Sequence, residues 1–245
     1  MISLPIKKIL LACFGIITIK WKKIIQISLF PIGSIFLLTN FAFDLTSFIE
    51  APQEFMFEII ILALVNLLLY SILSVNIHRM VILGDDSIPL FGILFPNSQV
   101  LKFYSWIIFI ISFIFFVNIV LISLLMLLFA QTNSVTTFIS IFISYYILIR
   151  LSLALPAIST NTAVRFQTIW ELTKGQMPQL IIILAGFPLL ILVISNLILN
   201  LLGANIFGAI FINFIQIFML VWGIVSIALC YQELIKKANQ QQQNL

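Results

Sequence analysis

Six long runs of continuously apolar residues dominate the chain, at approximately 24–43, 57–77, 104–129, 135–155, 180–200 and 206–229. None of them shows the alternation of polar and apolar positions that marks a lipid-facing β-strand. Each run is close to the ~20 residues that a helix needs to cross a bilayer. Only helices and closed barrels satisfy their backbone within lipid. The pattern therefore predicts an all-α polytopic membrane protein with six transmembrane helices.

A shorter apolar run at residues 9–19 precedes the first long run and has lysines on both sides. It is too short to cross a hydrocarbon core of about 30 Å at about 1.5 Å per residue. A lysine cluster follows it instead of a small-residue cleavage site, which argues against a signal peptide. We therefore predict an interfacial helix over residues 3–22. The alternative is a cytoplasmic extension that only sets the topology.

The distribution of charge assigns a side to each connection between the apolar runs. With the N-terminus inside, all 12 Lys and Arg residues fall in the inner segments 1–23, 78–103, 150–179 and 230–245. The outer connections carry only acidic charges, at Asp44, Glu50, Glu54 and Glu58. This positive-inside pattern predicts six spans with both termini cytoplasmic. The net charge of +4 is then a signal of topology and does not indicate nucleic acid binding.

The composition agrees with a lipid environment, since 62% of the residues are hydrophobic and 8% are charged. A soluble domain has roughly 25% charged residues. The mean hydropathy is +1.23.

An internal repeat is indicated by the match between Phe30-Pro31 and Phe187-Pro188, each near the start of a span and preceded by a tryptophan, Trp21 or Trp170. The unit is an inner interfacial segment followed by a helical hairpin. We predict three hairpins, each preceded by an inner-side interfacial helix, in pseudo-repeats of about 1–80, 81–156 and 157–235. They form one membrane domain, 1–235, followed by a disordered polar tail, 236–245. Pro31 and Pro188 are predicted helix breaks.

The segment 150–175 contains the most detailed local signals. Pro156 is predicted to end the fourth span, and the polar run 159–162 offers N-caps for an amphipathic helix over 164–172. Gly175 is predicted to cap that helix at its C-terminus. Arg150 has two candidate partners, the carboxylate of Glu171 and a lipid phosphate.

The polar residues within and beside the spans supply the candidate functional sites. Basic residues predicted to contact lipid or another anion are Arg79, Arg150, Arg165 and Lys174. Amides predicted to bond between helices, or alternatively to line a pathway, are Asn66, Asn118, Asn213 and Gln216. His78 with Asp85 or Asp86 is a poor metal-ligand set, and a polar turn explains it better. No catalytic residue, metal or cofactor is predicted, because no catalytic motif occurs.

The residues 150–157, RLSLALPA, followed by WELTKG at 170–175, carry a family resemblance. Together with His78-Arg79 and the stretch 83–85, LGD, they resemble uncharacterised bacterial six-span inner-membrane proteins. These are the YciC-like group and the membrane domain attached to some glycerophosphodiester phosphodiesterases. The resemblance implies a protein of the bacterial cytoplasmic membrane and no established activity. This sequence contains no phosphodiesterase domain, so that chemistry does not carry over.

Two functions from different classes follow. The first is a non-enzymatic membrane component that assists lipid organisation or a partner complex, with anionic lipids of the cytoplasmic leaflet as its main partners and a protein partner as a further option. The second is a small transporter or permease subunit, suggested by the two prolines and the amides. No charged residue lies near the middle of a span, which disfavours a proton or ion pathway. A membrane-embedded enzyme ranks third.

Overall fold

The computed structural model describes residues 4–41, 56–129, 134–162, 166–202 and 206–243, and every regular element in these ranges is a helix. The elements are α1 (Ile6–Ile19), α2 (Trp21–Phe41), α4 (Met56–Leu83), η1 (Asp85–Ser87), α5 (Ser98–Phe129), α6 (Ser134–Ser152), α7 (Ala154–Ser159), α8 (Phe166–Leu172), α9 (Met177–Ile181), η2 (Ile182–Gly186), α10 (Phe187–Leu202) and α11 (Ile206–Gln243). The prediction of an all-α fold is confirmed.

Within the described ranges, six helical segments are long and apolar enough to cross a membrane, as the sequence predicted. They are Trp21–Leu38, Met56–Leu83, Ser98–Leu127, Val135–Ser159, Met177–Asn200 and Ile210–Gln240. Helix α1 has only 14 residues, too few to span the hydrocarbon core.

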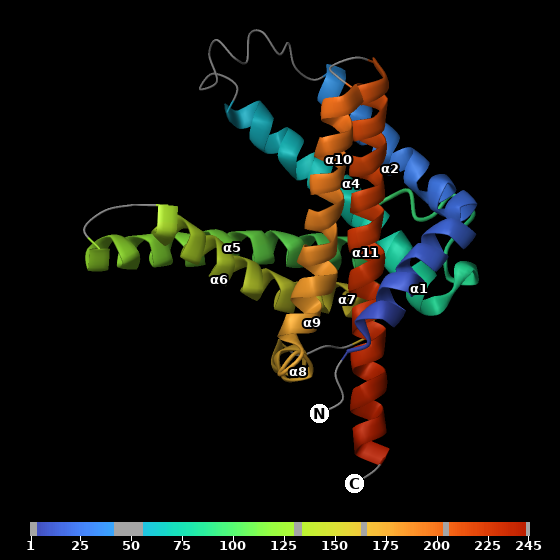
Figure 1. The fold of residues 1–245 in the computed structure, drawn as a ribbon. Coiled ribbons are helices and arrows are strands. Elements are labelled where there is room, and N and C mark those ends of the chain that lie inside the picture. The colour runs from blue at the N-terminus through green and yellow to red at the C-terminus, as the bar shows by residue number, and fades with distance from the viewer. Residues whose placement is uncertain (1–3, 42–55, 130–133, 163–165, 203–205, 244–245) are drawn as a thin grey trace.

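Consecutive long helices lie in contact, α2 with α4, α5 with α6, and α10 with α11. Figure 1 shows the three pairs extending in different directions from a common region, with α5 and α6 running crosswise to α10 and α11. Helices α1, α7 and α9 lie where the pairs meet, and α1 and α7 both contact α11.

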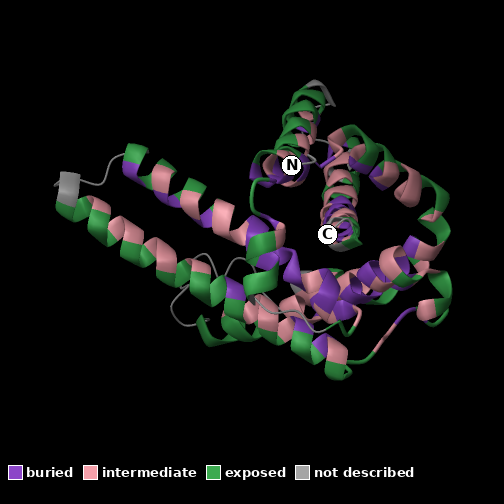
Figure 2. Ribbon diagram, turned by 90° about the horizontal axis from the view of Figure 1, so that it is seen from below, coloured by how far each residue is buried: buried purple, intermediate pink, exposed green. Residues whose placement is uncertain are grey.

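Burial is concentrated in this meeting region, which we call the hub (Figure 2). Its buried residues include Ile9, Cys13, Ile72, Leu73, Ile77, Met80, Ala154, Ala157, Trp222, Val225 and Ala228. Away from the hub, large apolar side chains are exposed, for example Leu127 at 83% and Phe207 at 71%. A helix that is apolar on all sides needs an apolar surrounding. The extended parts of the pairs are therefore the surfaces suited to lipid.

Helix α1 belongs to the hub through one buried face. Ile9 and Cys13, one turn apart, are buried against the other helices, whereas Lys7 and Lys8 are exposed. The Lys8 Nζ atom lies 2.7 Å from a carboxylate oxygen of Glu233 on α11.

We expect Cys13 to resist alkylation in the folded protein. Burial raises the pKa of the Cys13 thiol to about 12, so at neutral pH it holds about a thousandfold less thiolate than an ordinary cysteine. Cys230, the other free cysteine, is also buried. Maleimide labelling followed by mass spectrometry should detect neither adduct in the folded protein and both after denaturation. Rapid labelling of Cys13 without denaturation would contradict the packing of α1.

The two prolines differ in their effect on the helices. Helix α2 continues through Pro31, where the sequence predicted a break. Pro188 follows the π-helical segment η2, and α9, η2 and α10 run on without a gap. Because proline has no N–H, it leaves one carbonyl of the preceding turn without a backbone donor. The Tyr145 hydroxyl on α6 donates to the Leu184 carbonyl in that turn at 3.1 Å.

Residues 159–162 end α7 and do not begin α8, contrary to the N-cap prediction. The Thr160 and Thr162 hydroxyls donate to the Ala157 carbonyl at 3.1 and 3.0 Å. Asn161 has a φ of 58°, the left-handed conformation common after a helix. These side chains satisfy carbonyls at the C-terminus of α7, and residues 163–165 lie outside the described ranges.

Two further predictions in this part of the chain concern Pro156 and Gly175. Pro156 does not end the fourth span as predicted, because α6 ends four residues earlier at Ser152, Pro156 lies inside the short helix α7, and the apolar segment Val135–Ser159 continues past it. Gly175 has a φ of 77°, but it lies three residues beyond Leu172, the end of α8, so it belongs to the turn before α9 and is not the residue that caps α8.

Helix α11 continues through the region that was predicted to be a disordered tail, and ends at Gln243. Lysine, alanine and glutamine all have good helix propensity, and no proline or glycine follows Gly223 to stop the helix.

Candidate functional site

Arg150, near the end of α6, is a buried cation held between aromatic side chains. Arg150 as a whole is only 6% exposed. The guanidinium carbon lies 4.1 Å from the centre of the Trp170 ring and 4.9 Å from that of Tyr146. Its Nη2 atom donates a 2.6 Å hydrogen bond to the Tyr146 hydroxyl. Tyr146 is one helical turn before Arg150, so α6 presents both on one face, and α8 supplies Trp170.

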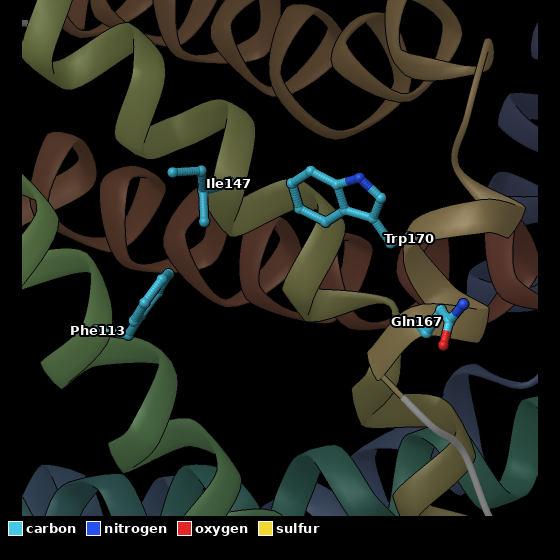
Figure 3. A pocket seen from close by; sticks show the side chains of 4 residues that line it. All are labelled: Phe113, Ile147, Gln167 and Trp170. Atoms are coloured by element: carbon cyan, nitrogen blue, oxygen red, sulfur yellow. The ribbon is translucent and has the colours of Figure 1, made fainter.

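An apolar groove of about 310 Å³ adjoins this arrangement, lined by Phe113, Ile147, Gln167 and Trp170. Figure 3 shows the Trp170 indole extending from α8 toward α6, with Phe113 reaching into the same space from α5. Its volume lies at the small end of the ~300–1,000 Å³ typical of ligand pockets. The lining suits a hydrocarbon, and Gln167 is its one amide.

The charge of Arg150 has no counterion among the described residues. Glu233 pairs with Lys8 and Asp85 pairs with Lys20, and the Nε atom of Arg150 is buried without a hydrogen-bond acceptor. An arginine cannot lose its proton, and burying an ion costs several kcal/mol after relaxation. Each ring offsets roughly 0.5–2 kcal/mol of this cost. The uncompensated positive charge therefore makes the site chemically suited to an anion.

Glu171 is not the partner of Arg150, although the sequence offered it as a candidate. Its carboxylate accepts a 3.2 Å hydrogen bond from the Gln167 amide on the exposed side of α8. Of the two candidate partners, Glu171 is excluded, and the lipid phosphate stays a prediction.

Arg79 makes a complete set of contacts within the protein. Its Nε and Nη2 atoms donate to the Ser87 carbonyl, and its Nη1 atom donates to Gln99 at 2.9 Å. These bonds fasten the connection between α4 and α5, so the role of Arg79 is to hold this loop. Lys174 is exposed. Arg165, the fourth predicted anion contact, lies outside the described residues.

The predicted intramembrane amides have different surroundings. Asn118 on α5 accepts a 2.7 Å hydrogen bond from Ser140 on α6 and thus links the two helices. The Asn66 side-chain oxygen is buried without a donor. Asn213 and Gln216 are exposed on α11. The groove beside Trp170 contains none of these four residues.

His78 and Asp85 do not form a common site. His78 is buried in the hub, where its ring meets Phe103 edge-on at 5.7 Å, while Asp85 is exposed and pairs with Lys20 at 2.7 Å. In the part of the chain that the structure describes, no three His, Cys, Asp or Glu side chains are placed to hold a metal ion.

Asn76, which the sequence pattern did not single out, is a fully buried residue of α4 whose side chain bonds to both backbone groups of Ile93. Its Nδ2 atom donates to the Ile93 carbonyl at 3.1 Å, and its Oδ1 atom accepts from the Ile93 N–H at 2.8 Å. An amide within an apolar run was the available signal, since buried amides need such partners. Tyr146 was also missed, although its place one turn before Arg150 was visible in the sequence.

The chain matches no protein-family model, no curated protein and no solved structure.

Proposed function

We propose that this chain is a non-enzymatic component of the bacterial cytoplasmic membrane that binds anionic phospholipid of the inner leaflet. In this proposal the hub lies at the cytoplasmic side with both termini, and the three helix pairs cross the bilayer as hairpins. Crossing one bilayer together requires the α5–α6 pair to swing about the hub from its crosswise direction until it lies along α10 and α11. The positive-inside distribution of lysine and arginine supports this orientation. The resemblance to six-span inner-membrane proteins supports the location.

The observation that carries the proposal is the buried charge of Arg150. A phosphate supplies the negative charge that balances the guanidinium, and arginine matches phosphate geometry with paired N–H groups. The groove beside Trp170 takes hydrocarbon from the same molecule, because its lining is apolar. Trp170 suits the headgroup level, where aromatic side chains with a polar atom are enriched.

Arg150→Met should weaken binding of phosphatidylglycerol by about 10- to 100-fold. A charge-assisted hydrogen bond contributes about 1.5–3 kcal/mol, and every 1.4 kcal/mol is about tenfold. The same substitution should leave the unfolding free energy unchanged or raise it by about 1–4 kcal/mol, because it removes a buried ion. Native mass spectrometry of protein titrated with phosphatidylglycerol measures binding, and reversible unfolding in mixed micelles measures stability.

Arg79→Met is the matched control, since Arg79 is the other arginine at an inner end of a span. It should lower the unfolding free energy by about 1–3 kcal/mol, because the Ser87 carbonyl and Gln99 lose their donors, and it should leave phosphatidylglycerol binding intact. If Arg150→Met retains its lipid, or if phosphatidylcholine binds as tightly as phosphatidylglycerol, the proposal is wrong.

A further inference from the structure

A second, larger groove lies on the opposite flank of the hub, between α2 and the loop that precedes α5. It measures about 470 Å³, and its walls include Gln26, Leu29, Gly33 and Leu37 from α2, with Phe91 and Leu94 from the loop. The lining is apolar except near Gln26 and one serine of α2. It shares no residue with the groove beside Trp170.

The residues that α2 contributes form one stripe along the helix. Gln26, Leu29, Gly33 and Leu37 follow one another at intervals of three and four positions, so they share a face. One turn before Gln26, the same face carries Lys22. The stripe therefore passes from a cation, through an amide, into hydrocarbon side chains.

The Lys22 ammonium is available to a ligand. The residue is exposed, its Nζ atom lies 5.8 Å from the centre of the Trp21 ring, and no described carboxylate forms an ion pair with it. The neighbouring Lys20 and Lys23 differ in this respect. Lys20 pairs with Asp85, and Lys23 donates to the carbonyls of Pro89 and Leu90 at 3.1 and 3.2 Å.

The loop wall of the groove is fixed on both sides of Phe91. Lys23 holds the Pro89 and Leu90 carbonyls to α2, and Asn76 holds both backbone groups of Ile93 to α4. The groove is thus formed before any ligand arrives, which lowers the ordering cost of binding.

We propose that this groove binds an acyl chain of an anionic phospholipid whose headgroup contacts Lys22. The charge at one end and the continuous apolar floor match the two parts of such a lipid. The backbone at Gly33 leaves room, since a Cβ atom built there would meet no atom within 4 Å. This inference rests on the proposed function and adds a second lipid site, remote in sequence from Arg150.

The test fills the groove without disturbing the protein. Gly33→Leu places a branched side chain in open space within the groove and should weaken phosphatidylglycerol binding at this site at least tenfold. Gly15→Leu is its control, because Gly15 is also helical and has no atom within 4 Å of its added Cβ. Lys22→Gln should weaken binding severalfold, whereas Lys102→Gln, at another exposed lysine, should not.

Native mass spectrometry of each full-length variant with phosphatidylglycerol counts the retained lipids. Equal lipid counts for Gly33→Leu and Gly15→Leu would overturn the assignment. Displacement of a second copy of the chain or of a bound protein by Gly33→Leu would also overturn it, as would an unchanged affinity in Lys22→Gln. Arg150→Met reports separately on the first lipid site. If Arg150→Met loses lipid and Gly33→Leu does not, only the second lipid site is rejected.

Discussion

Trp222→Ala is expected to lower the unfolding free energy by about 3 kcal/mol. Trp222 is fully buried in α11 and contacts three other rings. It stacks on Phe187 of α10 at 4.4 Å between ring centres and meets Phe14 of α1 at 4.7 Å and Phe218 at 5.9 Å. Removing a buried tryptophan costs about 3–5 kcal/mol in soluble proteins. We expect the lower end of this range, because lipid also keeps the indole out of water in the unfolded state. The main cost is then the loss of packing contacts.

Reversible unfolding in mixed micelles, followed by circular dichroism, measures this change. Trp222→Phe is the matched control, since it keeps one stacked ring and removes an indole N–H that has no acceptor. Its cost should be less than half that of the alanine variant. Equal stability of Trp222→Ala and the unmodified protein would show that the aromatic cluster does not hold α1 to α11.

Gly92→Ala should lower the unfolding free energy by a similar amount, about 3 kcal/mol, for a different reason. Gly92 has a φ of 76°, where an L-residue is strained by about 1–2 kcal/mol. An added Cβ would also lie 2.8 Å from the Asn76 side-chain nitrogen. Asn76 would have to move and release Ile93, and each buried hydrogen bond lost costs about 0.5–1.5 kcal/mol.

A double-mutant cycle with Asn76→Ala separates the two causes. With Asn76 truncated, the clash is absent, so Gly92→Ala should cost only the backbone strain. The two substitutions together should therefore destabilise by about 1–2 kcal/mol less than the sum of the single changes, as expected for residues in contact. Strict additivity would mean that the side chain of Asn76 does not restrict position 92.

The number of spans could be predicted from the sequence because lipid imposes one strong rule on composition. A run such as 104–129 is long and apolar enough to be assigned to lipid without knowing which helices pack against it. Contacts between residues that lie far apart in the chain leave no comparable pattern in the sequence. Trp222 looked like any apolar residue of the sixth span, and only the fold brings Phe14 and Phe187 to its ring.

Predictions from local sequence patterns failed where a side chain could serve either of two neighbouring helices. The hydroxyls at 160 and 162 satisfy α7, which lies before them in the chain, because side chains of this type serve a helix end on either side. Pro31 was predicted to break α2, yet the helix continues through it. The partner of Arg150 was equally hidden, since Glu171 turns to Gln167 instead.

The contact between α1 and α11 has a consequence for biosynthesis. A ribosome completes α1 long before α11 exists, yet Cys13, Trp222 and Val225 belong to one packed cluster. Each helix pair can enter the membrane as soon as it is made, in keeping with insertion before helix association. The hub can close only after the sixth span has emerged. Until then the apolar face of α1 can pack only against earlier elements such as α2 and α4 and lacks its contacts with α11. A nascent protein halted before residue 206 therefore leaves part of that face uncovered and open to quality-control proteases.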